Sequence, residues 1–394
     1  MKDHIYAVHC WIKGGGALNV LEALLHKKIR NGQSVGAIFT LYSDRDWLSI
    51  QREDKDKRGS RECIQIPIIT ALPQRLNKLF RWADVKKPPL ITYFLDYRNL
   101  MPFFPQLMKL LSHKLIRTLK QQDADILISS YAVAKNIDVP EGIFKEIYFH
   151  QPMHYIRPLY EEYVGYMKGW KRRLYKKITP ILRRRDSQSR SYDIIYANSE
   201  STKQQIQKIY FPEQQLDIQV IHPPIDEAFF YEPVVTVPDN YFFYINRLTK
   251  MFKHLDKIIH LCNEYKIPLI IAGDGPDKIE LMKMAGPTIT FVGWVSDEQT
   301  KISLMKKSRG VINIAHESFG IVTAEALLLG VPIFGYNGGA TPELVDEQSG
   351  LLVNSLEKQE LSDQFRKFLA QEFDRKAIQG RARQRFSEGQ KFWN

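Results

Sequence analysis

Short apolar segments alternate with helix-forming segments along most of the chain, and this alternation limits the possible folds more than any other feature. Short apolar runs are typical of buried strands, and the segments between them have the apolar spacing of helices. Strands separated by helices form parallel sheets that are covered on both faces. The sequence therefore predicts an α/β fold with doubly wound sheets. The expected strands are residues 5–11, 35–41, 124–130, 145–150 and 192–199 in the first half, and residues 241–245, 268–272, 288–292, 310–314, 331–336 and 350–353 in the second.

A pair of prolines separates these two sets of strands. A chain of 394 residues exceeds the usual size of one hydrophobic core, so two domains are expected. Pro223 and Pro224 cannot continue a helix or a central strand, which makes this point a natural hinge. We predict one domain at residues 1–222, a second at 223–372, and a basic helical tail at 373–394 that can return to the first domain.

The composition is that of an ordinary globular protein, with 44% hydrophobic and 25% charged residues. The sequence contains no run of eighteen apolar residues, so no transmembrane helix is expected. The first residues lack the long apolar region of a secretory signal. Cys10, Cys63 and Cys262 are odd in number and form no metal motif, so we expect reduced thiols, at most partly exposed, and a cytoplasmic location.

Basic residues are in excess, 56 Lys and Arg against 44 Asp and Glu, which predicts anionic partners. Residues 166–185 contain nine basic and no acidic side chains, with Met167, Trp170, Leu174 and Ile178 at helical spacing. Such a helix can lie on an anionic membrane, or it can pack its apolar stripe on the core. No nucleic-acid-binding motif accompanies the charge. The predicted membrane contacts are Trp170, Lys171, Arg172, Arg173, Lys176 and Lys177.

Two glutamates, Glu317 and Glu325, flank a predicted strand-to-helix junction. The strand is expected at residues 310–314 and the helix at residues 322–329, so the first glutamate lies on the loop and the second inside the helix. The first-turn amides between them are unpaired donors at the electropositive end of a helix. This arrangement suits an anion or a hydroxyl-rich ligand.

A glycine-rich turn, which includes Gly15 and Gly16, follows the first predicted strand and precedes a helix at residues 17–29. Glycines let the backbone approach a phosphate or a sugar closely. The turn is not the G-x-G-x-x-G fingerprint, and no suitable acidic residue follows the next strand, so a nicotinamide cofactor is disfavoured.

The glutamate pair, the following residues 330–333 and Gly338-Gly339 together resemble the donor site of retaining glycosyltransferases of family 4. Residues 246–248, 253–259, 272–276 and 291–295 are also similar to that family. In the first half, residues 150–153, 197–199 and 222–226 are similar to a subgroup of mannosyltransferases that build bacterial cell-surface polysaccharides. The resemblance implies the GT-B architecture, in which two Rossmann-like domains face each other across a cleft. It places the donor on the C-terminal domain and the acceptor on the N-terminal one.

The resemblance also implies roles for individual residues. Arg247 and Lys253 would neutralise the leaving diphosphate without a metal, since Arg binds phosphate bidentately and Lys supplies a point charge. In the family the lysine follows the arginine by five residues, and here Lys253 follows by six, so Lys250 is the alternative. His150 would lie beside the reacting sugar. Glu317 would contact hydroxyls of the donor sugar. The other expected donor-binding residues are Gly15, Gly16, Gly273, Gly275, Val295, Phe319, Gly320, Ile321 and the ribose-binding Glu325.

A retaining mechanism often uses a carboxylate nucleophile, and the sequence offers no obvious candidate. Same-face attack, with the leaving phosphate taking the acceptor proton, is the alternative that the family implies. The expected reaction transfers a hexose to a lipid-linked or polysaccharide acceptor at the inner face of the cell membrane. The leading expectation for the donor is GDP-mannose. A UDP- or dTDP-sugar donor such as glucose, N-acetylglucosamine or rhamnose is the main alternative. An inactive scaffold that keeps the fold is another. No cofactor or metal is expected.

Overall fold

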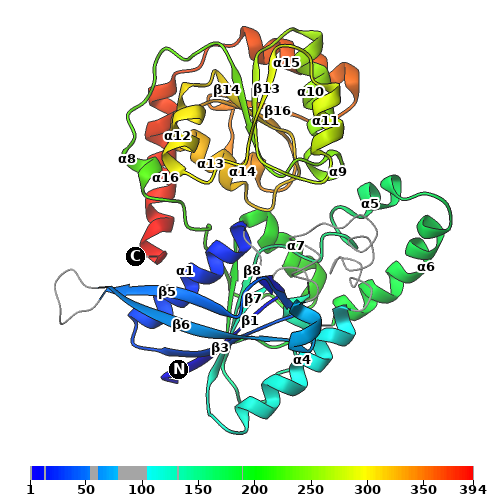
Figure 1. Cartoon of the computed structure of the whole chain (residues 1–394), viewed down its shortest axis with the longest axis vertical. Coiled ribbons are helices and arrows are strands. Elements are labelled where there is room, and N and C mark those ends of the chain that lie inside the picture. Colours follow the sequence, from blue (N-terminus) through cyan, green and yellow to red (C-terminus); the bar gives the residue numbers. More distant parts are fainter. Residues whose placement is uncertain are drawn as a thin grey trace.

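The computed structural model describes residues 2–12, 15–53, 61–78, 104–130, 133–188 and 190–393. Two α/β domains are stacked along the long axis of the molecule, with the C-terminal domain at the top of Figure 1 and the N-terminal domain below it. The predicted α/β fold is confirmed.

The N-terminal domain is built on an eight-stranded sheet with the order β10-β9-β8-β7-β1-β3-β6-β5. A small pair of strands, β2 and β4, accompanies it. The strands are β1 (His4–His9), β2 (Trp11–Ile12), β3 (Ser34–Thr40), β4 (Tyr42–Ser43), β5 (Trp47–Glu53), β6 (Arg61–Thr70), β7 (Asp125–Ser130), β8 (Lys145–Phe149), β9 (Ile194–Ala197) and β10 (Ile218–Val220). The helices are α1 (Gly16–Arg30), α4 (Phe104–Leu119), the short 3₁₀ helix η2 (Ala134–Asn136), α5 (Tyr160–Tyr166), α6 (Gly169–Asp186) and α7 (Glu200–Tyr210).

One edge of this sheet departs from the purely parallel arrangement expected from the sequence. β5 and β6 pair antiparallel, with Trp47 opposite Pro67, and β6 then joins β3 in parallel. Leu48, Ile50 and Ile66 are buried on the inner face of this pair, while the polar residues between them face outward. Such a half-buried edge alternates apolar and polar residues, so it lacks the continuous apolar runs that indicate parallel strands.

The C-terminal domain has a fully parallel six-stranded sheet with the order β13-β12-β11-β14-β15-β16. The strands are β11 (Phe242–Ile245), β12 (Leu269–Ala272), β13 (Ile289–Gly293), β14 (Gly310–Asn313), β15 (Ile333–Tyr336) and β16 (Gly350–Val353). The helices are α8 (Ala228–Tyr231), α9 (Lys250–Lys253), α10 (Leu255–Glu264), α11 (Lys278–Met284), α12 (Glu298–Lys307), α13 (Ile321–Leu328), α14 (Thr341–Leu344), α15 (Lys358–Ala370) and α16 (Arg375–Trp393).

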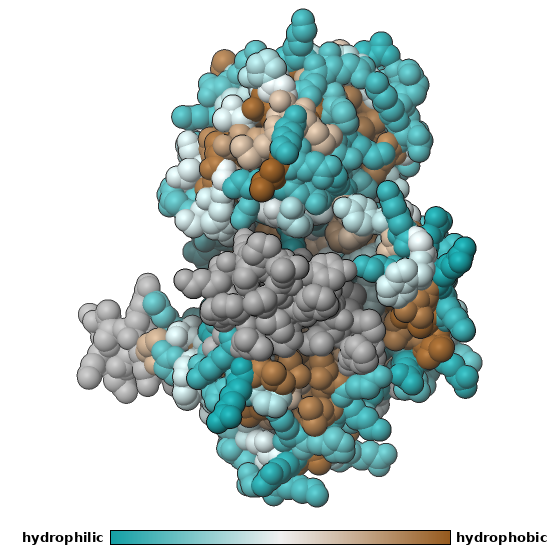
Figure 2. Space-filling view, turned by 45° about the vertical axis from the view of Figure 1, so that its right-hand side comes forward, coloured by the Kyte–Doolittle hydropathy of each residue, from teal (hydrophilic) through white to brown (hydrophobic). Residues whose placement is uncertain are grey.

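Helices α5 and α6 project from the side of the N-terminal domain (Figure 1). The sequence predicts that Pro180 ends or kinks this helix, and α6 continues through Pro180 to Asp186. Pro180 lies in the C-terminal half of the helix, and its side chain is exposed to solvent. Apolar and hydrophilic residues lie side by side on this projecting part of the surface (Figure 2). None of the helices that the structure describes is long and apolar enough to cross a membrane.

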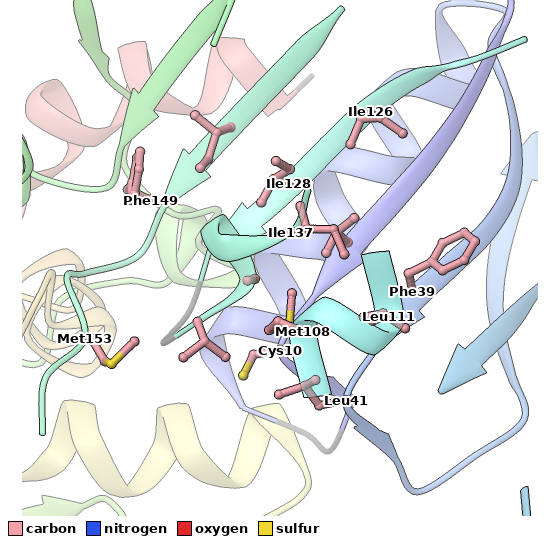
Figure 3. Packing of buried hydrophobic residues seen from close by; sticks show 14 of the residues in the cluster. Cys10, Phe39, Leu41, Met108, Leu111, Ile126, Ile128, Ile137, Phe149 and Met153 are labelled. Atoms are coloured by element: carbon pink, nitrogen blue, oxygen red, sulfur yellow. The ribbon is translucent and has the colours of Figure 1, made fainter. Parts of the chain in front are cut away.

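Each sheet packs its helices through buried apolar side chains. In the N-terminal domain, Phe39 and Ile126 of the sheet pack against Met108 and Leu111 of α4 (Figure 3). Cys10 lies in the same cluster, and burial raises the pKa of its thiol. Cys262 is buried in the C-terminal domain, as expected, whereas Cys63 is exposed, contrary to the expectation that all three thiols are buried or half-buried.

The last helix joins the two domains. α16 packs against α13 in the C-terminal domain and ends against α1 of the N-terminal domain (Figure 1). There, Trp393 is buried in the N-terminal core, and its indole Nε1 donates a hydrogen bond to the carbonyl of His222 at 2.9 Å. The tail therefore spans the hinge, and its end belongs to the packing of the first domain.

Candidate active site

The candidate site lies where strands of both sheets end at the boundary between the domains. In an open α/β sheet, ligands bind beyond the carboxyl ends of the strands, at the point where the strand order reverses. In the C-terminal sheet that point lies between β11 and β14. Asn246 directly follows β11, and Glu317 follows β14 by a short loop. The topology therefore brings these two residues together.

Glu317 forms a nearly buried ion pair. Its carboxylate Oε1 accepts a hydrogen bond from Nζ of Lys253 at 2.7 Å, and both side chains are less than one-fifth exposed. The amides of Asn246 and Asn313 donate to the same oxygen at 3.4 and 3.5 Å. Burial alone would raise the pKa of Glu317, but the Lys253 ammonium and the two amides outweigh it and lower the pKa. The carboxylate is therefore ionised at neutral pH and is held by three donors.

The two candidate lysines have different partners. α9 is a single turn that carries both, and it ends at His254 in the left-handed conformation with φ of 49°. This turn accommodates the extra residue and directs Lys253 toward Glu317. Lys250 instead pairs with the exposed Glu280 at 2.5 Å. Arg247 is exposed, and its backbone N–H donates to the Asn246 side chain at 2.9 Å.

The loop after Glu317 presents backbone amides at the start of α13. Gly320 has φ of 92°, a left-handed conformation that favours glycine, and α13 starts at the next residue, Ile321. The side chain of Phe319 is buried, with its ring 5.0 Å from His222 and 6.4 Å from Phe386. Phe319 is therefore an anchor of the loop, and only its backbone can face a ligand.

Glu325 lies one turn into α13 and is also buried. Its Oε1 accepts a hydrogen bond from Lys301 Nζ at 2.6 Å, and Lys301 also contacts Glu298 at 2.9 Å. Burial raises the pKa of Glu325 to about 7, although the Lys301 ammonium acts in the opposite direction. Its second oxygen, Oε2, is buried and has no hydrogen-bond partner among the described residues. Lys301 was not predicted from the sequence, because it lies on a helix with no recognisable motif.

The comparisons with known proteins identify the C-terminal half. Residues 227–385 match the family described as Glycosyl transferases group 1. This stretch, called the group 1 domain below, is similar to that family. A Klebsiella pneumoniae protein of 41.2 kDa from the cps region is 28% identical over 106 residues, or 27% of this chain and 29% of the relative. The O-antigen chain mannosyltransferase C of Escherichia coli is 26% identical over 162 residues, or 39% of this chain and 43% of the relative. The match thus spans less than half the length of either relative.

Solved structures resemble the whole chain. Sucrose-phosphate synthase from Thermosynechococcus elongatus aligns over 100% of this chain and 95% of its own, with a TM-score of 0.64 and 15% identity. A lipopolysaccharide outer core galactosyltransferase in its apo form aligns over 97% and 95%, with a TM-score of 0.58 and 14% identity. The chain therefore has the GT-B fold, and the predicted resemblance to GT-B glycosyltransferases is confirmed.

His150 lies at the end of β8, opposite the group 1 domain. It is buried, and its Nε2 lies 2.8 Å from the hydroxyl of Ser129. The carbonyl of the same serine accepts a hydrogen bond from Nδ1 of His9 at 3.1 Å. Burial lowers the pKa of His150 well below its usual value, and the neighbouring His9 lowers it further. The imidazole is therefore neutral. His9 and Ser129 could not be predicted from the sequence, because their spacing from His150 forms no local motif.

The glycines singled out from the sequence have different structural roles. Gly15 has φ of 97°. A Cβ on Gly16 would lie 2.9 Å from the Ile321 side chain of the group 1 domain, so the glycine-rich turn approaches the start of α13 across the domain boundary. A Cβ on Gly273 would lie 2.0 Å from the carbonyl of Asn246, and one on Gly275 would lie 2.2 Å from the carbonyl of Leu248. These last two glycines allow two backbone segments to pack closely. Val295 is half-buried and packs against the core of its domain.

The basic helix α6 exposes part of its apolar stripe. Trp170 is 69% exposed, Leu174 48% and Ile181 55%, whereas Met167 and Ile178 are half-buried. The side chain of Tyr175, on another face of the helix, packs against Tyr160 and Tyr163 of α5. The five basic residues proposed as membrane contacts, Lys171, Arg172, Arg173, Lys176 and Lys177, are all exposed. A second, smaller basic stretch with aromatic residues occurs at residues 75–82, and residues 79–82 of it lie outside the described residues. Over the described ranges, no group of three acidic, His or Cys side chains is arranged to hold a metal ion.

Proposed function

We propose that the chain is a retaining glycosyltransferase of family 4 that transfers a hexose from a nucleotide-diphosphate sugar. The Lys253–Glu317 ion pair at the start of α13 is the observation that carries this proposal. It places a cation and an ionised carboxylate together at the switch point of a group 1 glycosyltransferase domain. A leaving diphosphate needs a cation beside it, and an ionised carboxylate can accept hydrogen bonds from the hydroxyls of a sugar.

The proposed donor site uses backbone and side-chain groups without a metal. Arg247 and Lys253 would stabilise the charge that develops on the leaving diphosphate. Glu317 would accept hydrogen bonds from sugar hydroxyls, next to the amides of Gly320 and Ile321. The unpartnered oxygen of Glu325 would accept one from the ribose.

The proposed reaction retains the anomeric configuration through attack on the face that the phosphate leaves. The acceptor oxygen forms a bond to the anomeric carbon as the bond from that carbon to the phosphate oxygen breaks. The phosphate oxygen takes the acceptor proton, so no protein carboxylate forms a covalent intermediate. His150, neutral and fixed by Ser129, would hydrogen-bond a sugar hydroxyl rather than carry a proton.

Mannose from GDP-mannose is the donor that we propose first. Two kinds of relative support this choice: the Escherichia coli mannosyltransferase and a Mycobacterium tuberculosis protein called GDP-mannose-dependent alpha-mannosyltransferase, which is 30% identical over 102 residues and 27% of its length. A uridine-linked donor is the alternative, because an Anabaena structure with a TM-score of 0.55 and 17% identity contains UDP-glucose.

A thermal-shift panel tests the donor. A ligand that binds only the folded chain raises the melting temperature. We expect GDP and GDP-mannose to raise it more than UDP-glucose, UDP-N-acetylglucosamine or dTDP-rhamnose. A larger shift with a uridine or thymidine sugar would show that this sugar, rather than mannose, is the donor. The proposed mechanism would be unaffected. No shift with any of them would favour an inactive scaffold.

A substitution at Glu317 tests the assigned chemistry. Glu317→Gln keeps the size of the side chain and removes the acceptor charge, so we expect sugar transfer to fall by orders of magnitude while the chain stays folded. Glu280→Gln, an exposed substitution in the same domain, is the control. Normal turnover by the Glu317 variant would contradict its role.

The acceptor that we propose is a lipid-linked or polysaccharide saccharide at the inner face of the cell membrane, with α6 lying on anionic lipid. The exposed Trp170 and Leu174 and the basic residues around them support this proposal. Replacing Lys171, Arg172 and Arg173 by Ser should weaken binding to liposomes that contain anionic lipid. The matched control replaces three exposed lysines outside α6, Lys208, Lys283 and Lys307. Equal binding by both triple variants would contradict a specific role for α6.

A further inference from the structure

A contact between the domains lies directly beside Glu317. Ser318, the next residue, accepts two hydrogen bonds at its carbonyl, from the hydroxyl of Ser199 at 2.7 Å and from that of Thr202 at 3.4 Å. Its own hydroxyl accepts one from the side-chain amide of Asn198 at 3.3 Å. The three donors belong to the N-terminal domain, at the start of α7. The loop that carries Glu317 is therefore held from the opposite domain.

Glu343 makes a second contact with the same helix start. Its Oε2 accepts the backbone N–H of Glu200 at 2.9 Å, and its Oε1 accepts that of Ser201 at 2.6 Å. These are first-turn amides of α7, which have no partner within the helix, and a carboxylate is the group that a helix start favours. Glu343 lies in the C-terminal domain, on α14, and both of these hydrogen bonds reach across the domain boundary.

The two contacts lie on hydrogen-bonded backbone segments of the C-terminal domain. The chain that leads into α14 pairs with the Glu317 backbone, because the Ala340 N–H donates to the Glu317 carbonyl at 2.8 Å and Gly339 forms a bridge with Glu317. A Cβ on Gly339 would lie 2.0 Å from that carbonyl, so the approach is close. Glu343 and Ser318 are thus connected through the backbone of Glu317.

We infer that Glu343, with Asn198 and Ser199, is a positioning residue for the transfer reaction: it docks the start of α7 and thereby fixes the Glu317 loop only when the domains are together. This inference rests on the proposed function. It also explains the 197–199 motif, whose residues lie outside the donor site and hold the loop beside it. The Lys253, Arg247 and Glu325 groups for the nucleotide lie within the C-terminal domain and do not depend on this contact.

The test separates placement of the loop from binding of the nucleotide. Glu343→Ala removes both acceptors, and Glu347→Ala removes an exposed carboxylate from the same domain as a matched control. We expect Glu343→Ala to bind GDP or UDP, whichever the wild type binds, within about twofold of the wild type. Hydrolysis and transfer of the sugar nucleotide that the panel selects should lose about tenfold or more in kcat with little change in KM, because a misplaced loop weakens contacts made in the transition state and leaves nucleotide binding intact. Glu343→Gln, which keeps one acceptor oxygen, should recover part of the loss.

Amide hydrogen exchange gives a readout that needs no activity. The amides of Ala340 and Ala324, which donate to the Glu317 and Gly320 carbonyls of this loop, should exchange at least about fivefold faster in Glu343→Ala than in the wild type, and Glu347→Ala should match the wild type. Unchanged exchange in this loop, or unchanged kcat, would overturn the inference. If the wild type binds no sugar nucleotide, the proposed function fails, and the exchange experiment still decides whether Glu343 holds the loop.

Discussion

Replacing Lys253 by Met should destabilise the chain through the carboxylate that the lysine leaves behind. Removing one partner of a buried ion pair costs about 3 to 5 kcal/mol, because the remaining charge is buried without compensation. Here the side chains of Lys253 and Glu317 are each almost one-fifth exposed to solvent. In the variant, the amides of Asn246 and Asn313 would still donate to Glu317, at 3.4 and 3.5 Å in the wild type. We therefore expect a loss of about 2 to 3 kcal/mol in the free energy of unfolding at pH 7.5, below the range for a fully buried pair.

The loss should depend on pH in a defined direction. In the wild type the pKa of Glu317 is lowered, so the pair stabilises the fold above the usual carboxyl pKa of 4.5, and this stability is lost as the pH falls through the lowered value. In Lys253→Met, burial still raises the pKa of Glu317, and only the amides of Asn246 and Asn313 still lower it. The pKa of Glu317 should therefore be higher than in the wild type. A protonated Glu317 is tolerated, and the variant should approach the wild type as the pH falls toward 4.5.

Urea unfolding, followed by tryptophan fluorescence and far-ultraviolet circular dichroism at pH 7.5 and pH 5, measures both effects. The double variant Lys253→Met/Glu317→Gln should be more stable than Lys253→Met alone at pH 7.5, because it removes the uncompensated charge. Lys250→Met is the matched control, since Lys250 pairs with an exposed glutamate, and an exposed pair contributes about 0 to 1 kcal/mol. Equal stability of Lys253→Met and the wild type at pH 7.5, or a pH-independent difference, would refute the reasoning.

Two further substitutions test other parts of the site. Glu325 has a raised pKa of about 7, so its burial favours the protonated form, and stability should fall by up to about 3 kcal/mol as the pH rises from 4.5 through 7. Glu325→Gln should flatten this dependence in a thermal-unfolding series, and an unchanged slope would show that another group causes it. Gly16→Val should place side-chain atoms against Ile321 and hold the domains apart, so transfer should fall about tenfold or more while the melting temperature changes little. Small-angle scattering should then show a larger radius than for the wild type, and an unchanged radius with unchanged transfer would contradict the contact.

The amino-acid sequence alone determined the local order of the fold. Short apolar strands, helix boundaries and the two prolines at the hinge are readable because each depends on residues close in the chain. The same holds for the strand, loop and helix around Glu317, and for the resemblance of the C-terminal half to glycosyltransferases. The antiparallel edge formed by β5 and β6 was not predicted from the sequence. Only one face of this edge is buried, so its apolar residues alternate with polar ones and form no continuous run.

Only the tertiary structure decided which side chains meet. The contact of Lys253 with Glu317 follows a left-handed residue at the end of α9, and the pairing of Lys301 with Glu325 joins two helices. The contact of Glu343 with the start of α7 joins residues 142 and 143 positions apart. Charges at such separations come together only through the packing of the sheets and the closure of the domains. The sequence therefore determined where the candidate ligands of the sugar nucleotide lie along the chain, and the packing determined which of them are ionised, paired and held in place.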